Sequence, residues 1–252
     1  QTELIFDGAS FCFDNKGKMC LLGKKYEEDF LIYETKNNYN EILEIESSFE
    51  DEVISALILG IKDYVQKTGF KKVLVGLSGG IDSALVTYLA VQALGKENVH
   101  VVMMPSIYSS EGSIKDSEKL IYNLGISSEN ISIQPVFDVT LKQLENSFKN
   151  KSIDITEENI QSRIRGLYLM ALSNKHNYLL LTTGNKSEIA TGYATLYGDM
   201  CGALAVIGDV YKTQVYQIAN FINKEKEIIP NEIILKAPSA ELRPNQKDQD
   251  SL

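Results

Sequence analysis

Short apolar runs alternate along residues 47–252 with longer segments in which apolar side chains recur every three or four positions. The short runs are rich in Val, Ile and Leu, as is typical of strands buried on both faces of a parallel sheet. The longer segments have the period of helices that pack one face on a core. This alternation predicts an α/β fold with a doubly wound, mostly parallel sheet. Strands are expected at 73–77, 99–104, 131–135 and 178–182, and helices at 48–67, 82–95, 111–124, 138–149 and 157–176.

The first 46 residues follow a different pattern. Residues 4–22 alternate loosely between apolar and polar positions and turn at 14–17, which predicts a β-hairpin. Residues 36–46 are mostly polar and are expected to form a linker. Ser47 and Glu50 have the spacing of a capping box, so the first long helix is expected to begin after Ser47. We therefore expect a short β segment over 1–35, a linker, and one large domain from residue 47.

A glycine-rich loop joins the strand at 73–77 to the next helix. Its sequence, SGGIDS at 78–83, places two glycines at the turn and puts Asp82 and Ser83 in the first helical turn. Glycines let a ligand approach the backbone closely, and helix N-terminal amides attract anions. A plain strand-to-helix turn is the alternative, but the surrounding hydroxyls and carboxylate favour phosphate binding. The loop is neither a Walker loop nor a dinucleotide G-x-G-x-x-G loop. It resembles the pyrophosphate loop of the ATP pyrophosphatase superfamily, whose members cleave ATP between the α and β phosphates.

A second polar segment follows the strand at 178–182. Residues 182–188 read TTGNKSE and bring Lys186 and Glu188 to the carboxyl edge of the sheet, where ligands bind in such folds. Mg²⁺ usually takes one or two carboxylates together with phosphate oxygens and water, so Asp82 and Glu188 are the candidate metal ligands. Lys186 and Lys212 are candidates for offsetting charge on phosphates. The alternative is an ordinary polar turn at a strand end.

Composition narrows the class of protein. The chain has 252 residues, 44% hydrophobic and 23% charged, with a formal net charge of −9. That acidic balance argues against a general nucleic-acid surface. No apolar run approaches a membrane span, and no charged-then-apolar signal segment opens the chain, so no membrane association is expected. Three scattered cysteines and two histidines make a zinc site or a disulfide framework unexpected, which favours a cytoplasmic location.

Further along, the sequence from 183 to 213, TGNKSEIATGYATLYGDMCGALAVIGDVYKT, resembles the NAD⁺ synthetase family, in the branch that also carries a glutaminase domain. MPSIYSS at 104–110, ENIQSRIR at 158–165 and KAPSAEL at 236–242 fit the same family. The resemblance covers residues 47–252 and implies an adenine nucleotide α-hydrolase-like fold. LIFDGASF and the acidic residues at 27–29 resemble the end of the nitrilase-like glutaminase domain, so residues 1–35 are expected to be a remnant of it.

That family makes NAD⁺ from deamido-NAD⁺, ATP and ammonia, releasing AMP and pyrophosphate through an acyl-adenylate. The nicotinate carboxylate is ionised at pH 7, so its attack on phosphorus needs alignment and charge neutralisation rather than a general base. Ammonia must later lose protons, and Asp199 matches the family position near that event, with Lys186 as a second catalytic candidate. The alternative for Asp199 is a loop cap. The resemblance also implies a homodimer, with Mg²⁺ and ammonia drawn from solution or from a glutaminase portion.

The remaining site residues are carried over on the same motifs. Asn159 is expected to contact deamido-NAD⁺, with Arg163 and Glu188 beside it. The alternative for Arg163 and Arg165 is surface ion pairing. Residues expected to contact ATP are Gly76, Leu77, Ser78, Gly79, Gly80, Ile81, Asp82, Ser83, Thr183, Lys212 and Ser239.

Other functions stay open at the level of sequence. The superfamily also contains GMP-forming and tRNA-thiolating enzymes, but a thiolating enzyme would want a reactive cysteine pair and a basic surface. A nucleotide-binding module without catalysis is the alternative from a different class. The family's chains continue beyond position 252, so the C-terminal end is expected to be incomplete and a binding-competent but inactive fragment is conceivable.

Overall fold

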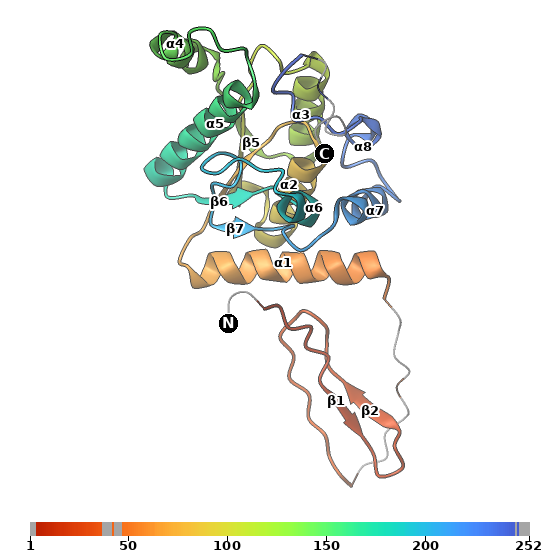
Figure 1. The fold of residues 1–252 in the computed structure, drawn as a ribbon. Coiled ribbons are helices and arrows are strands. Elements are labelled where there is room, and N and C mark those ends of the chain that lie inside the picture. The colour runs from red at the N-terminus through yellow and green to blue at the C-terminus, as the bar shows by residue number, and fades with distance from the viewer. Residues whose placement is uncertain (1–3, 37–41, 43–46, 245, 247–252) are drawn as a thin grey trace.

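In the computed structural model, which describes residues 4–36, 42, 47–244 and 246, a five-stranded parallel sheet forms the centre of the molecule (Figure 1). The central strand β3 (Val73–Gly76) pairs with β4 (Val99–Met103) on one side and β6 (Leu179–Thr182) on the other. The edge strands are β5 (Ser127–Asn130) and β7 (Leu204–Ala205), giving the order β5-β4-β3-β6-β7. The predicted parallel α/β sheet is therefore confirmed.

Helices cover both faces of this sheet because side chains of a strand alternate between the two faces. On one face, Val73 and Val75 pack in a core with helices α1 (Phe49–Lys67), α2 (Ile81–Leu94), α3 (Glu111–Leu124), α7 (Lys212–Ile222) and α8 (Asn231–Leu235). On the other face, Leu74 packs in a smaller core with α4 (Gln134–Leu144) and α5 (Ile155–His176). The short helix α6 (Lys186–Thr191) follows β6, and the 3₁₀ turn η1 (Lys96–Asn98) precedes β4. The sheet is thus doubly wound.

Several predicted boundaries are wrong. The third strand is Ser127–Asn130, not 131–135, because the exposed polar residues of this edge strand pair with β4 while Ile133 is buried in the core beside α4. The following helix accordingly begins at Gln134 rather than 138. The helix after it begins at Ile155, with Asp154 as N-cap rather than Thr156. The two-residue strand β7 was not predicted.

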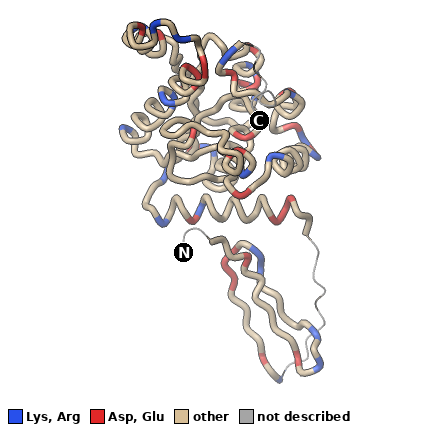
Figure 2. The backbone as a smooth tube through the Cα atoms, in the orientation of Figure 1, with Lys and Arg blue, Asp and Glu red and all other residues tan. Residues whose placement is uncertain are grey.

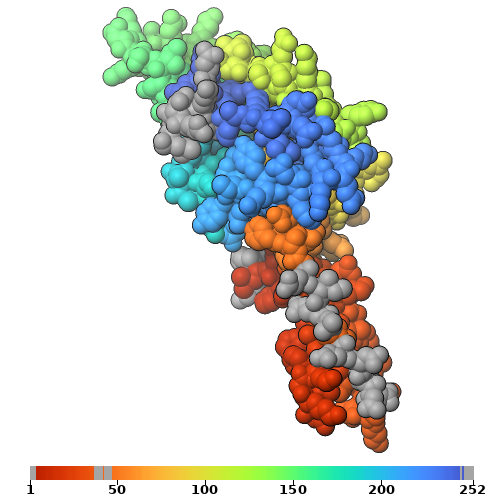
Figure 3. Space-filling model, turned by 90° about the vertical axis from the view of Figure 1, so that its right-hand side faces the viewer, coloured from red at the N-terminus to blue at the C-terminus, as the bar shows by residue number. Residues whose placement is uncertain are grey.

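The N-terminal segment forms the predicted hairpin from β1 (Phe11–Phe13) and β2 (Met19–Leu22). Asp14 stabilises the turn by accepting hydrogen bonds from the backbone N–H groups of Lys16 and Lys18 at 2.8 and 2.9 Å. The hairpin projects from the sheet domain as a separate lobe, with α1 between the two (Figures 1 and 3). The expected linker at 36–46 lies almost entirely outside the described residues.

The junction between hairpin and α1 centres on one carboxylate. Glu52 of α1 accepts hydrogen bonds from Lys25 Nζ at 2.8 Å and from Tyr26 Oη at 2.7 Å. The predicted helix start is shifted by one residue, because Ser48 rather than Ser47 is the N-cap and accepts from the Asp51 N–H at 3.1 Å. Across the part of the chain that the structure describes, no helix combines the length and apolar character that a membrane crossing requires.

Candidate active site

A cavity of about 380 Å³ opens at the carboxyl ends of β3 and β6. Its walls come from the 76–83 loop, the end of β4, helix α5, and the segments around 182–184, 193–201 and 236–242. This is the sheet edge at which ligands bind in doubly wound folds, next to the central strand. Most of the predicted site residues line it, among them Asp82, Thr183, Glu188, Asp199, Lys212 and Ser239.

The 76–83 loop is held open by its own hydroxyls. Ser83 Oγ donates to the Gly80 carbonyl at 3.0 Å and lies 3.1 Å from Ser78 Oγ, which accepts from the Gly80 N–H at 3.2 Å. Gly80 is the N-cap of α2, and no side chain caps that terminus. The first amides of α2 are therefore left for a ligand at the positive end of the helix, an arrangement suited to phosphate.

Gly79 cannot be replaced without cost. Its φ is +80°, in the left-handed region, and a Cβ at this position would lie 2.5 Å from the carbonyl oxygen of Ser113 in α3. Gly79 itself does not line the cavity, although its neighbours do. Its role is therefore to let the loop press against α3 so that the flanking residues face the ligand.

Asp82 joins the two halves of the site. Its Oδ1 accepts from Asn185 Nδ2 at 3.0 Å, and its Oδ2 accepts from Lys212 Nζ. Burial alone would lower the pKa of Lys212, but the charges of Asp82 and Glu188 outweigh burial and raise it. Lys212 therefore stays protonated beside Asp82, as the predicted phosphate-binding role requires.

Glu188 is the second carboxylate of the predicted metal pair. It forms a capping box with Asn185: Glu188 N–H donates to Asn185 Oδ1, and Asn185 N–H donates to Glu188 Oε2, both at 3.0 Å. Burial and the nearby charge of Asp82 raise the pKa of Glu188 to about 7. Two mutually repelling carboxylates fit a hard divalent cation, which would relieve the repulsion. Among the described residues no cluster of three or more candidate ligands exists, so phosphate or water would complete the shell.

Asp199 lies in the 195–201 loop and is held by backbone contacts. Its Oδ1 accepts from the Thr195 N–H at 2.7 Å, and its own N–H donates to Ser162 Oγ at 3.1 Å. Desolvation of the carboxylate raises the pKa of Asp199 above its ordinary value, which makes it a better proton acceptor than an ordinary aspartate. The same loop contacts two other predicted residues: Thr195 Oγ1 donates to Asn159 Oδ1 at 2.8 Å, and Arg163 Nε donates to the Leu196 carbonyl at 3.2 Å.

Besides Gly79, three predicted residues do not line the cavity. From outside the lining, Asn159 accepts from the Thr195 hydroxyl and Arg163 donates to the Leu196 carbonyl. Lys186 points to the exposed Asp209, with its Nζ 2.8 Å from Oδ1 and 5.0 Å from the centre of the Tyr211 ring. The first turn of α6 directs Lys186 outward because the inward positions hold Glu188 and the N-cap Asn185. Lys186 is thus a surface ion-pair residue here.

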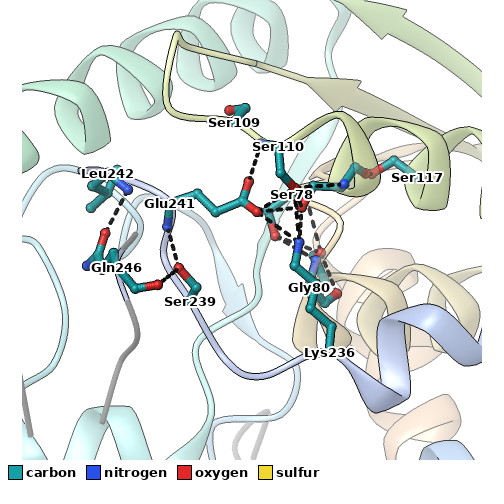
Figure 4. A network of polar contacts seen from close by, with 12 residues as sticks. Ser78, Gly80, Ser109, Ser110, Ser117, Lys236, Ser239, Glu241, Leu242 and Gln246 are labelled. Atoms are coloured by element: carbon teal, nitrogen blue, oxygen red, sulfur yellow. Dashed lines mark hydrogen bonds and ion pairs between the residues drawn. The ribbon is translucent and has the colours of Figure 1, made fainter. Parts of the chain in front are cut away.

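Sequence reasoning missed a polar network at the end of the chain. Figure 4 shows Glu241 and Lys236 reaching from the 236–242 segment toward Ser110 and the glycine loop. Glu241 accepts from Ser110 Oγ, Ser113 Oγ and Lys236 Nζ, each at 2.8 Å, and from the Ser110 N–H at 3.1 Å. Burial opposes ionisation of Glu241, but these bonds outweigh it and hold its pKa below the ordinary value.

Ser239 is the one residue of this segment that was predicted, and its hydroxyl hydrogen-bonds to the nearby C-terminal backbone. Its Oγ donates to the Gln246 carbonyl at 2.7 Å and accepts from the Glu241 N–H at 3.2 Å. The available signal for the network was the KAPSAEL motif, whose lysine and glutamate bracket the predicted serine. The segment therefore closes one side of the cavity through its own side chains, across α3 and the glycine loop.

Comparison with known proteins supports the family that the sequence motifs resemble. The family model described as NAD synthase matches residues 53–252. A glutamine-dependent NAD(+) synthetase of Thermotoga maritima is 48% identical over 290 residues, covering 100% of this chain and 50% of the relative. The chain spans about half the length of the curated relatives it matches.

Two solved structures agree in fold. That of a glutamine-dependent NAD⁺ synthetase from Acinetobacter baumannii, in complex with ADP, has a TM-score of 0.88 at 39% identity, covering 95% of this chain and 47% of that one. That of an NH₃-dependent NAD synthetase from Campylobacter jejuni, in complex with nitrate, has a TM-score of 0.67 at 33% identity, covering 74% of this chain and 77% of that one.

Proposed function

Since this chain belongs to the NAD synthase family, we propose that it carries the ATP-dependent amidation of deamido-NAD⁺ to NAD⁺ through an acyl-adenylate, with release of AMP and pyrophosphate. The observation that carries the proposal is a cavity in which an uncapped helix terminus, the Asp82–Lys212 pair and Asp199 meet. Adenylation needs the helix terminus and the Asp82–Lys212 pair to bind the phosphates. Aminolysis needs a proton acceptor such as Asp199.

In the first half-reaction the residues mainly bind and align. The free amides of α2 and the hydroxyls of Ser78 and Ser83 would bind the polyphosphate. Lys212 supplies positive charge beside Asp82. Asp82 and Glu188 would hold Mg²⁺, which when bound supplies charge neutralisation to the leaving pyrophosphate. The nicotinate carboxylate then attacks the α-phosphorus as an anion, so no histidine or cysteine is needed.

In the second half-reaction ammonia attacks the acyl carbon and must lose protons. Asp199 is the proposed acceptor, since its oxygen is fixed by the Thr195 N–H and its pKa is raised by burial. Asn159 and Arg163 would act on deamido-NAD⁺ through the Thr195 hydroxyl and the Leu196 carbonyl that they contact, or after a shift of that loop. AMP departs as the leaving group.

The proposal also covers the domain organisation, the oligomeric state and the source of ammonia. Residues 1–35 are proposed to be the end of a glutaminase domain, 47–252 the synthetase domain, and the assembly a homodimer. Ammonia would come from solution or from that glutaminase domain, in a cytoplasmic enzyme. Basic and acidic positions are interspersed over the sheet domain and the hairpin (Figure 2), which supports a nucleotide substrate over a tRNA.

One assay tests the function. Purified chain is incubated with ATP, Mg²⁺ and deamido-NAD⁺, with and without ammonium, and AMP, pyrophosphate and NAD⁺ are quantified. We expect NAD⁺ and AMP in equal amounts only when every component is present. ATP binding without AMP release under any of these conditions would instead identify a nucleotide-binding module without catalysis.

A further inference from the structure

Arg165 is a cation of the cavity wall that forms no ion pair with any carboxylate of the described residues. It lies on α5, lines the cavity, and donates from Nε to the Met104 carbonyl at 3.1 Å. A guanidinium has five N–H donors, so the four on its two terminal nitrogens make no hydrogen bond within the described residues. Across the same residues no carboxylate lies within 4.0 Å of Arg165. Surface ion pairing, the alternative given for this residue, is therefore wrong.

The other cations of the cavity are already neutralised. Lys212 is paired with Asp82, and Lys236 is paired with Glu241. Burial lowers the pKa of Arg165 to about 10, against the opposing charge of Glu241, so the side chain remains charged at neutral pH. A partly buried cation without an ion-pair partner among the described residues loses hydration that nothing there replaces. A ligand that brings negative charge into the cavity would remove that cost.

The neighbours of Arg165 along α5 show which part of a ligand it faces. One turn before it, Ser162 Oγ accepts from the Asp199 N–H. One turn after it, Leu169 packs against Gly76 at the start of the glycine loop, where a Cβ would lie 3.1 Å from Leu169 Cδ1. Arg165 thus occupies the helix turn between the phosphate-binding loop and the proposed proton acceptor. In the proposed reaction the α-phosphate is the group that lies between the polyphosphate held by the loop and the acyl carbon near Asp199.

We propose that Arg165 binds an oxyanion of the ligand, namely the α-phosphate of the nucleotide and then of the acyl-adenylate. The planar guanidinium can donate two parallel hydrogen bonds to phosphate oxygens, which the single ammonium of a lysine cannot do. The proposal rests on the proposed function for the identity of the ligand. The binding chemistry itself requires only an adenine nucleotide.

The test measures binding rather than turnover. The dissociation constant of ATP is measured by calorimetry, and AMP and adenosine are titrated as competitors, for the wild-type chain, Arg165→Met, Arg165→Lys and Lys175→Met. Lys175 is an exposed cation near the far end of the same helix and serves as the matched control. The methionine keeps most of the apolar stem of Arg165 and removes the charge.

We expect Arg165→Met to weaken AMP and ATP by about tenfold to a hundredfold, the range for a lost charged hydrogen bond, and to change adenosine less than twofold. Arg165→Lys should give a smaller loss, and Lys175→Met none. The melting temperature of ligand-free Arg165→Met should equal or exceed that of the wild type, because an unpaired buried charge has been removed. A merely structural arginine would instead lower it.

Equal losses for AMP and adenosine, or an unchanged affinity for AMP, would overturn the assignment. Should Arg165→Met fail to fold, Arg165→Lys decides: full AMP affinity in that variant also contradicts bidentate phosphate binding. Each outcome is separate from the proposed function, because wild-type chain can form NAD⁺ whether or not Arg165 contacts phosphate. Failure of the amidation assay with intact, Arg165-dependent AMP binding would leave this inference standing.

Discussion

Asn185 donates a hydrogen bond from Nδ2 to Oδ1 of Asp82 at 3.0 Å, across 103 positions of sequence. Asn185 is fully buried and also caps α6, so one side chain fixes the helix that follows β6 against the helix that follows β3. The two predicted metal ligands, Asp82 and Glu188, stand on either side of this contact. Their spacing is therefore set by a neutral amide before any cation binds.

The first prediction concerns Asp82. Asp82→Asn should lower turnover by roughly 10²–10³, the scale for losing one preorganised charge-stabilising group, because the amide neither holds a cation nor pairs with Lys212. AMP release is measured over a range of Mg²⁺ concentrations. Asp63→Asn, at an exposed pair with Lys67 on α1, is the control and should retain full turnover. A folded Asp82→Asn chain with unchanged turnover at limiting Mg²⁺ would disprove the assignment.

The second prediction is a pH dependence of stability. Because the pKa of Glu188 is raised from 4.5 to about 7 in the folded chain, the folded state holds a proton that the unfolded state has released. The stabilising effect of that proton is fully present below pH 4.5 and is lost as pH rises through 7. Glu188→Gln cannot ionise, so it should match the wild type at pH 4.5 and be more stable by up to about 3 kcal/mol at pH 8.

This difference is read from urea unfolding of ligand-free protein in the presence of a chelator. The exposed substitution Glu145→Gln controls for the loss of a single negative charge. A Gln variant that is less stable than the wild type at pH 8 would show that Glu188 is held ionised by contacts outweighing its burial.

The third prediction separates the cost of a left-handed backbone conformation from the cost of a steric clash at Gly79. Gly69 and Gly79 have nearly the same φ, +82° and +80°, but only at Gly79 does a Cβ meet other atoms. Gly69→Ala should cost about 1 kcal/mol for the left-handed conformation. Gly79→Ala should cost clearly more, about 3 kcal/mol or above, and should weaken ATP binding because the loop must withdraw from α3. Equal losses of unfolding free energy for the two variants would contradict the close approach to Ser113.

The fourth prediction concerns the carboxylate that holds the 236–242 segment. Glu241→Gln should reduce the unfolding free energy by about 1–3 kcal/mol at pH 7, since an ionised acceptor of several hydrogen bonds is lost. Because the pKa of Glu241 is lowered in the folded chain, the wild-type advantage is present above the ordinary pKa and declines as pH falls below it.

Hydrogen exchange locates the effect of that substitution. Amides of 236–242 should exchange faster in Glu241→Gln than in the wild type, while those of β3 stay protected. Glu111→Gln, at an exposed position in the first turn of α3, is the matched control. Unchanged protection of 236–242 would mean that backbone contacts alone hold the segment.

The fifth prediction concerns the hairpin. Phe11 and Phe13 are 64% and 52% exposed, and two-stranded hairpins are marginal in water. Amides of β1 and β2 should therefore exchange within minutes, long before those of β3. Glu52→Gln should speed them further, because it weakens the contact with Lys25 and Tyr26. Protection of β1 equal to that of β3 in dilute chain would contradict this expectation.

The sequence predicted the strands well where a strand is buried on both faces and its residues are therefore mostly apolar. The strands at β3, β4 and β6 are short apolar runs covered on both faces, so composition alone marks them. It failed for β5, whose four exposed residues Ser127–Asn130 carry no apolar signal and are held only by pairing with β4. The apolar run just after it was mistaken for the strand because Ile133 supplies core packing from a turn.

The candidate site shows the same limit. Asp82, Glu188 and Lys212 follow buried strands or begin helices at one sheet edge, so topology brings them together. Lys186 and Arg165 could not be placed, because a helix can turn a charged side chain either way and the direction depends on tertiary neighbours. Lys186, predicted as a catalytic residue, points away from the cavity, whereas Arg165, for which surface pairing was the alternative, lines it.

The strand order has a consequence for how the protein folds. β3 can pair with β4 soon after both exist, but its other neighbour, β6, arrives only after α3, β5, α4 and α5. Closing such a long segment is entropically slower than forming local contacts. Until that pairing occurs the cavity lacks the walls formed by 182–184 and 193–201, so the nucleotide site is incomplete earlier on the pathway. Bound nucleotide therefore stabilises the native state but not the folding transition state. It should lower the unfolding rate and leave the folding rate unchanged.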